Sequence, residues 1–290
     1  MVLCPRLAGV APCTAHSMAS CAPLSAAAQQ LLNGSTLFTL LASTSTPGTL
    51  AQLRHMQRDL GPHRVFLTFD DTNERWTHTP AQRLTARRNS NAPHEALPPV
   101  LLFNRSEADA VAGRLAGKGG QNYYEVPAIA LLYRYLEGRA TFDHGDVRCK
   151  GHFAECLAST VAQPQDVLCT WSWSQQQQPE WDKWDRLAGT LNKVPAAQRR
   201  SCFAPLLRLS RRAMRQISQQ MGRSAGYMEL LYGTLAVARN LSIDVIPESA
   251  IAYMTTGYHL PDAELDMRFA APCADNRIYH PIKDCGSLHC

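Results

Sequence analysis

Long apolar segments are absent from this sequence. No run of apolar residues approaches the roughly 20 that a helix needs to cross a bilayer, so no membrane-spanning helix is expected in this chain. The first 35 residues also lack the continuous apolar stretch of a signal peptide. We therefore expect residues 1–35 to be a disordered or targeting leader and residues 36–290 to form a folded domain.

Several motifs that identify enzyme and metal-site classes are also missing. None of the ten cysteines forms a C-x-x-C pair, which argues against a zinc ribbon or a thioredoxin-type site. The G-x-S-x-G, G-x-G-x-x-G and H-E-x-x-H motifs do not occur. The glycine-rich segment 113–119 is not a P-loop, because Lys118 is followed by glycine rather than by Ser or Thr. Disulfides remain possible, but the cysteine spacing dictates no pairing.

The charge of the chain is low and slightly positive. A net charge of +5, from 29 Lys+Arg and 24 Asp+Glu, does not argue for nucleic acid as a partner and fits a nucleotide diphosphate equally well. With 45% hydrophobic and 18% charged residues over 290 positions, the chain has the composition of a globular protein with a buried core. Sequons begin at Asn33, Asn104 and Asn240 and are compatible with a secretory location.

The ordered pattern begins as a strand, a helix and a second strand. Residues 36–42 form an apolar run of strand formers, and residues 50–60 carry apolar side chains at helical spacing. A second strand is expected at 64–69. Such βαβ units build parallel sheets. We therefore predict an α/β fold, with a mostly parallel central sheet and flanking helices.

Further elements follow this unit. Residues 72–98 are polar and proline-containing, which predicts a long surface loop. Ser210 is a plausible N-cap for a helix with an apolar face. The C-terminal tail is expected to be rich in loops. The remaining expected elements are strands at 100–103, 166–173, 206–209 and 243–246, helices at 108–115, 127–136 and 227–238, and a helical turn at 151–157.

Acidic residues form two clusters in the sequence, one at 70–71 and one at 143–146. Asp70 and Asp71 close a predicted strand, and ligands of open α/β sheets bind outside the carboxyl ends of the strands. Asp143 and Asp146 are spaced to hold Mg²⁺ or Mn²⁺, which prefer oxygen ligands and bridge diphosphates. Ordinary polar turns explain both clusters as well.

Other polar and aromatic residues have two interpretations each. Glu229 begins a predicted helix, where it can serve as a general base or simply favour the helix dipole. His280 can ligate a metal and Lys283 can neutralise phosphate, although such a pair is unremarkable in a tail. Aromatic side chains line many sugar sites but are more often part of a core, and four tryptophans lie close in sequence: Trp171, Trp173, Trp181 and Trp184.

The order of these pieces, from the first strand and its Ser/Thr-rich turn to the His280–Lys283 segment, resembles the GT-A nucleotide-diphospho-sugar transferases. The resemblance implies a single Rossmann-like domain, a divalent metal (Mn or Mg), a nucleotide-sugar donor and a glycan, protein or small-molecule acceptor in the Golgi. It implies that the nucleotide is contacted by Ser43 and Thr44, in the turn after the first strand, and by Asp70 and Asp71, at the end of the next strand. It implies that Asp146 and His280 bind the metal and that Lys283 contacts the diphosphate. It implies that the carboxylate of Glu229 contacts the acceptor.

One segment departs from the family pattern. No apolar run of strand length lies between Gly138 and Asp146, so the strand that should precede the metal-binding aspartate is expected to be missing. Three hypotheses follow. The chain is a metal-dependent glycosyltransferase, or a non-catalytic nucleotide- or glycan-binding relative or truncated inactive form, or a different α/β enzyme.

Overall fold

The computed structural model describes residues 23–34, 37–42, 47–61, 65–70, 100–103, 129, 133, 140–144, 147–161, 163–220, 223–254 and 276–280. None of the helices in these ranges has the length and apolar character that a bilayer-spanning helix requires. The predicted loop at 72–98 lies outside the described residues. Ile129 and Tyr133 are the described residues of the helix expected at 127–136, and both are helical.

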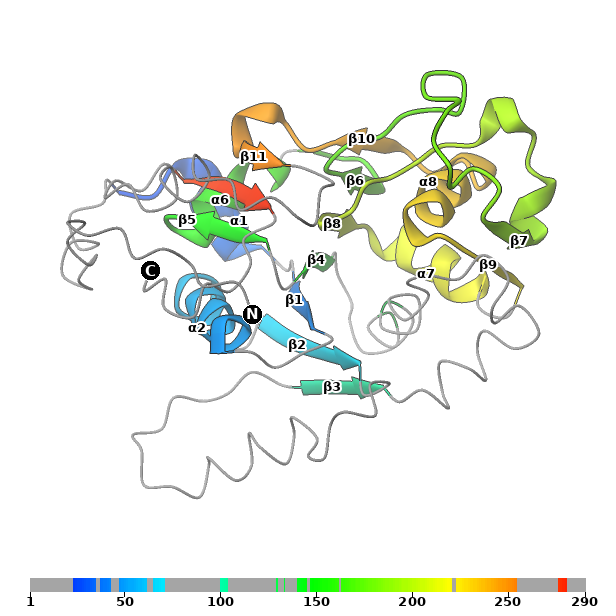
Figure 1. Cartoon of the computed structure of the whole chain (residues 1–290). Helices are drawn as coiled ribbons and strands as arrows, with labels where there is room; N and C mark the ends of the chain where they lie inside the picture. Colours follow the sequence, from blue (N-terminus) through cyan, green and yellow to red (C-terminus); the bar gives the residue numbers. More distant parts are fainter. Residues whose placement is uncertain are drawn as a thin grey trace, which may run out of the picture.

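A seven-stranded sheet forms the centre of the fold (Figure 1). Its strand order is β10-β6-β8-β4-β1-β2-β3. Strand β8 runs antiparallel to its neighbours β4 and β6, whereas the other adjacent strands are parallel. The fold is thus α/β, as expected, but the sheet is mixed. The strands are β1 (Leu37–Ala42), β2 (Val65–Asp70), β3 (Val100–Phe103), β4 (Ala140–His144), β6 (Val167–Cys169), β8 (Leu206–Leu209) and β10 (Ile243–Val245).

Strand β4 corrects the sequence prediction of a missing strand. Residues 140–144 pair with β1 on one side and with β8 on the other, and Asp143 is opposite Leu40 and Leu206. The segment has only two strong strand formers, Thr141 and Phe142. A strand held along both edges by backbone hydrogen bonds does not need a long apolar run, which is why pattern reading missed it.

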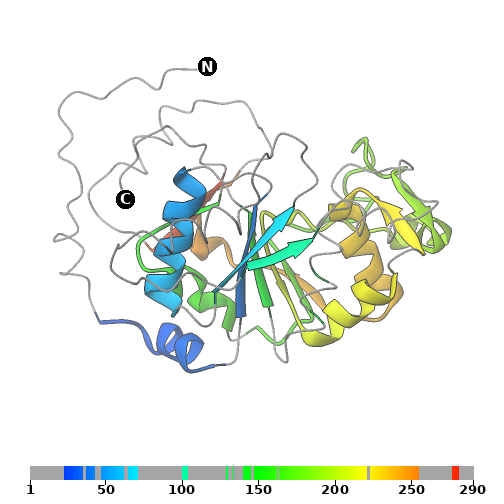
Figure 2. The same ribbon diagram turned by 90° about the horizontal axis from the view of Figure 1, so that it is seen from below.

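Helices cover both faces of the sheet (Figure 2). Three lie on one face: α1 (Ala26–Asn33), α2 (Pro47–Leu60) and α6 (Phe153–Val161). Two lie on the other: α7 (Arg211–Gln220) and α8 (Met228–Ala238). Each layer has its own apolar cluster, and β6 contributes to both, with Leu168 in one and Val167 and Cys169 in the other. This alternation is that of a strand buried on both faces.

Capping residues explain where two of these helices begin. Ser210 accepts a hydrogen bond from the Ala213 amide at 3.0 Å, which confirms the predicted N-cap of α7. Ser25 caps α1 in the same way, through the Ala28 amide at 3.1 Å. Helix α1 packs on α6 and buries Leu31. Residues 26–33 therefore belong to the folded part, although they fall inside the range expected to be a leader.

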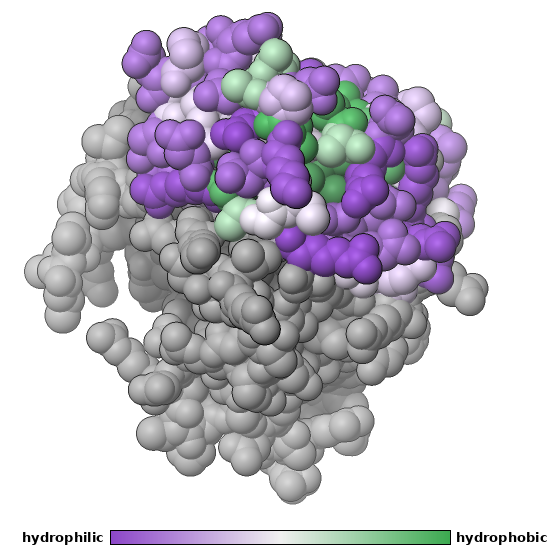
Figure 3. Space-filling view, turned by 90° about the vertical axis from the view of Figure 1, so that its right-hand side faces the viewer, coloured by the Kyte–Doolittle hydropathy of each residue, from purple (hydrophilic) through white to green (hydrophobic). Residues whose placement is uncertain are grey.

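Two smaller sheets complete the described structure. Strand β12 (Arg277–His280) lies between β11 (Ile251–Met254) and β5 (Arg148–Lys150), and β7 (Leu187–Gly189) pairs with β9 (Ser224–Gly226). The sequence predicted none of these strands, and β12 lies in the tail expected to be loops. Short 3-10 helices occur at Thr190–Lys193, Ala196–Gln198 and Glu248–Ala250. In Figure 3, the coloured part of the face on the β7–β9 side is mostly hydrophilic, with the apolar residues gathered in one smaller area.

Replacing Thr141 by proline tests the role of β4. Proline has no amide hydrogen to donate, so Thr141→Pro should lower the free energy of unfolding by at least about 2 kcal/mol. Thr141→Val keeps the amide and serves as the control. Urea unfolding monitored by circular dichroism measures both variants. Equal stability of the two variants would contradict a central, hydrogen-bonded β4.

Candidate functional site

The carboxyl ends of three parallel strands meet at one edge of the main sheet. Ala42 of β1 is opposite Phe69 of β2, and Leu41 of β1 is opposite His144 of β4. The chain proceeds outward from β1 to β2 and β3, and then returns to the other side of β1 with β4. This reversal between β1 and β4 is a topological switch point, where open α/β sheets bind ligands outside the strand ends.

Predicted site residues follow all three of these strands. Asp70 is the last residue of β2, and Asp71 comes next in the chain. Ser43 and Thr44 follow the end of β1, and Asp146 comes two residues after the end of β4. Asp71, Ser43, Thr44 and Asp146 lie outside the described residues. The described ends of β1, β2 and β4, which precede these residues in the chain, lie at one edge of the sheet.

His280 approaches the same edge from the small sheet. It is the last residue of β12, its exposed fraction is 7%, and its ring meets that of Phe203 edge-on at 5.9 Å between centroids. Phe203 comes three residues before Leu206, the residue of β8 that pairs with Asp143 of β4. The structure thus brings His280 near the strand that leads to the predicted metal ligand. Lys283 lies outside the described residues.

Glu229 is connected to the same segment through the backbone. It lies in the first turn of α8 and is half-buried, and its carbonyl accepts a hydrogen bond from the Cys202 amide at 2.7 Å. Cys202 is disulfide-bonded to Cys169, the last residue of β6. The segment Cys202–Phe203 therefore touches Glu229, His280 and the end of β6, which gathers these residues at one place.

A glycine permits the close approach of α8 to this segment. A Cβ atom at Gly233 would lie 2.2 Å from the Arg200 carbonyl oxygen and 2.6 Å from that of Ser201. Both neighbours are backbone atoms, which cannot move aside as a flexible side chain can. Gly233 thus sets the distance between α8 and the residues before Phe203.

The tryptophans divide into a packed group and one residue at the sheet edge. Trp181 makes edge contacts with Trp173, Trp184 and Tyr227 at 4.8–6.1 Å between ring centroids, and Trp184 is 2% exposed. These three tryptophans therefore have the core role. Trp171 instead stacks on Phe203 at 5.2 Å, beside His280, and remains half-buried.

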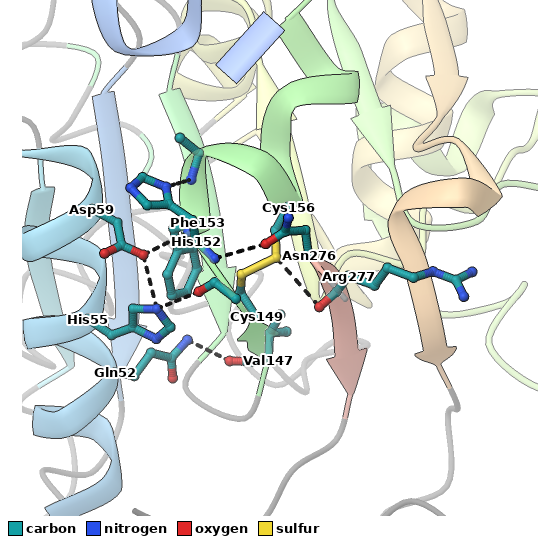
Figure 4. Close-up of a disulfide and its surroundings, with 12 residues drawn as sticks. Gln52, His55, Asp59, Val147, Cys149, His152, Phe153, Cys156, Asn276 and Arg277 are labelled. Atoms are coloured by element: carbon teal, nitrogen blue, oxygen red, sulfur yellow. Dashed lines mark hydrogen bonds and ion pairs between the residues drawn. A yellow bond between two sulfur atoms is a disulfide. The ribbon is translucent and has the colours of Figure 1, made fainter. Parts of the chain in front are cut away.

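The chain that follows Asp146 is held by polar side chains of α2, which we call the α2 clamp: Gln52, His55 and Asp59 (Figure 4). The Gln52 side-chain amide donates to the Val147 carbonyl at 2.6 Å. His55 Nε2 lies 2.8 Å from the Gly151 carbonyl and 3.0 Å from Asp59 Oδ2. Both partners are acceptors, so this nitrogen carries the proton.

Asp59 is the buried centre of the α2 clamp. Its side chain is 3% exposed, and it accepts hydrogen bonds from the Phe153 amide at 2.9 Å and from Arg58 at 2.8 Å as well as from His55. Burial alone raises the pKa of Asp59, but these hydrogen bonds and the charge of His55 outweigh it and lower the pKa to about 2.

A disulfide and a tight turn complete this region. Cys149 of β5 is bonded to Cys156 of α6, with their Cα atoms 6.2 Å apart. Gly151 adopts a φ of 139°, and a Cβ there would lie 2.2 Å from Asn276 Oδ1, so the turn requires glycine. Asn276 also accepts from the His152 amide at 3.1 Å. The clamp was not predicted from the sequence, although the spacing of residues 52, 55 and 59 places them on one face of a helix.

The described residues include no group of three or more His, Cys, Asp or Glu side chains arranged to hold a metal ion. Of the two metal ligands predicted from the sequence, His280 is described and Asp146 is not. The metal site therefore stays a prediction.

Among solved structures, the chain resembles a galactosyltransferase at a low level of similarity. No family model matches the chain, and no curated protein matches it. The galactosyltransferase LgtC, solved in complex with donor and acceptor sugar analogues, is similar to the chain with a TM-score of 0.44 and 8% sequence identity. The match covers 85% of this chain and 87% of that one. Similarity at this level does not determine the fold or the activity of this chain.

Adding a methyl group at Gly233 should destabilise the protein. Alanine normally favours a helix over glycine by about 1 kcal/mol, but the clash with two carbonyl oxygens should reverse the sign. We expect Gly233→Ala to lower the free energy of unfolding by about 1–3 kcal/mol in urea unfolding. Ala238→Gly, at the exposed end of α8, is the control for helix propensity. A more stable Gly233→Ala variant would contradict the close approach.

Removing the charge of Asp59 should change the acid stability. Because the pKa is lowered from 3.8 to about 2, ionised Asp59 stabilises the folded state above about pH 4, and this contribution is lost as the pH falls toward 2. Its size is about 2 kcal/mol. Asp59→Asn should lose it at neutral pH and flatten the stability profile between pH 4 and 2. Asp185→Asn, at a fully exposed carboxylate, should leave the profile unchanged.

Proposed function

We propose that the chain is a glycosyltransferase that binds a nucleotide sugar outside the carboxyl ends of β1, β2 and β4 and transfers the sugar to an acceptor hydroxyl. The observation that carries the proposal is β4, which ends two residues before Asp146 at a topological switch point of the sheet. The proximity of His280 and Glu229 to the segment beside β4 supports the same site.

Each predicted residue has a role at this site. Ser43, Thr44, Asp70 and Asp71 follow or end β1 and β2 and would bind the nucleotide. Asp146 and His280 would hold a divalent metal, with Lys283 near the diphosphate. When bound, such a metal neutralises the charge of the departing diphosphate.

Glu229 would act on the acceptor. A carboxylate in reach of the acceptor hydroxyl can accept its proton as the oxygen attacks the sugar. Glu229 lies in the first turn of α8, where a negative charge interacts favourably with the helix dipole. The half-buried Trp171, stacked on Phe203 at the same sheet edge, offers an aromatic face near this position.

The hypothesis of a non-catalytic relative loses its main support. It rested on the absence of a strand before Asp146, and β4 occupies that place between β1 and β8. A different α/β enzyme would be favoured if Asp70, Asp146 and Glu229 lay far apart with no shared cleft. Asp70 ends β2, and Glu229 and His280 contact the Cys202–Phe203 segment that precedes β8; the proposal is that these positions belong to one site at the carboxyl ends of the strands.

Replacing Asp146 tests the activity. With Mn²⁺ and a panel of nucleotide sugars, the parent should release nucleotide diphosphate, and both Asp146→Ala and the isosteric Asp146→Asn should be at least about 100-fold slower. Asp244→Ala, on the edge strand β10, should match the parent. Equal turnover in the Asp146 variants would remove this residue from the mechanism.

Calorimetry distinguishes a transferase from a binding protein that lacks activity. Nucleotide diphosphate should bind more tightly to the parent when Mn²⁺ is present, and Asp146→Asn should abolish that difference. Nucleotide binding that ignores the metal, together with no turnover, would contradict the proposal.

A further inference from the structure

A sequon lies immediately after helix α8. Asn240, Leu241 and Ser242 are all described, and the asparagine and the serine are exposed. We propose that Asn240 carries an N-linked glycan and that the chain folds in an oxidising, secretory compartment. The inference rests on this turn and on the disulfides, and it does not depend on the proposed glycosyltransferase activity.

The turn after α8 places the side chain of Asn240 in solvent. Asn240 has a φ of 51°, the left-handed conformation that often ends a helix and that asparagine tolerates. The backbone is held from inside, since the Leu241 amide donates to the Ala236 carbonyl at 2.9 Å and Arg212 donates to the Asn240 carbonyl at 3.1 Å. Leu241 is 6% exposed. The chain thus buries the middle residue of the sequon and exposes the acceptor asparagine.

A glycan at this position is compatible with the folded contacts. Among the described residues, the side-chain amide of Asn240 makes no hydrogen bond that a sugar would displace. The Ser242 hydroxyl, in contrast, bonds to the Asp166 amide at 2.8 Å and to its carboxylate at 3.2 Å. Because the folded turn engages this hydroxyl, we expect the glycan to be attached before the turn closes, and then to remain outside the packed structure.

The disulfides supply an independent reason to place the chain where sequons are modified. Cys149–Cys156 and Cys169–Cys202 involve four buried residues, each 3% exposed or less. Disulfides form and persist in the lumen of the secretory pathway and outside the cell, and are rare in the cytosol. An N-x-S/T sequon becomes a substrate for glycosylation in that same pathway.

The other two sequons are less completely defined. Asn33, the last residue of α1, is exposed, but Ser35 lies outside the described residues. Asn104 also lies outside them. Asn240 is therefore the sequon whose acceptor, middle residue and hydroxyl residue are all placed by the structure.

Mass spectrometry of the full-length protein, isolated from cells that produce it naturally, tests the inference. Peptide-N-glycosidase treatment in heavy-oxygen water should mark the peptide that contains Asn240, and non-reducing peptide maps should contain the Cys169–Cys202 and Cys149–Cys156 linkages. An Asn240 peptide recovered unmodified before treatment, or the four cysteines recovered as free thiols, would overturn the proposal.

Variants of the full chain, expressed in the same cells, assign the modification. Asn240→Asp keeps a residue that tolerates the left-handed turn but should remove one glycan and increase electrophoretic mobility. Ser242→Thr preserves both the sequon and a hydroxyl, and should keep the glycan. Unchanged mobility of Asn240→Asp relative to Ser242→Thr would refute a glycan at this position. Transferase activity has no part in these measurements, so their failure is distinct from failure of the proposed function.

Discussion

The main sheet depends on the pairing of one short strand. Strand β4 joins β1–β2–β3 to β8–β6–β10, and without it the sheet would fall into two three-stranded parts with unpaired inner edges. The same strand precedes Asp146 in the chain and pairs with the start of β8, three residues after Phe203. Backbone pairing along both sides of β4 therefore supports the fold and determines where the candidate site can form.

The α2 clamp holds the residues that follow Asp146 in the chain. Strand β4 fixes the chain up to His144, and the hydrogen bonds of Gln52, His55 and Asp59 fix it again from Val147 to Phe153. A buried carboxylate is unfavourable unless it is fully hydrogen-bonded, and Asp59 satisfies this requirement with three donors. The segments before and after Asp146 in the sequence are thus both held by hydrogen bonds.

The parts of the fold that sequence reasoning predicted are those with a local signal. Apolar runs and helical spacing identified β1, α2, β2, β3, β8, α7 and α8, and the Ser210 hydroxyl marked a helix start. Strand β4 has no such signal, because Asp143 and His144 interrupt its pattern and its pairing partners are distant in sequence. Strand β12, the Cys169–Cys202 disulfide and the contact of His280 with Phe203 are likewise set by residues far apart in the chain. The polar face of α2 could be recognised from the helical spacing of its residues, but the backbone groups that those residues contact could not be predicted.

The segment Cys202–Phe203 contributes both to the stability of the protein and to the geometry of the candidate site. Cys202–Phe203 holds the Glu229 carbonyl, supports the His280 ring and is tied to β6 through Cys169. A disulfide across a sequence separation of 33 contributes about 3–4 kcal/mol in the chain-entropy model. Reducing conditions should therefore release the segment that gathers the candidate site as well as lower the stability of the domain. The oxidising compartment proposed from the disulfides and the Asn240 turn would then be a condition for assembling the proposed site.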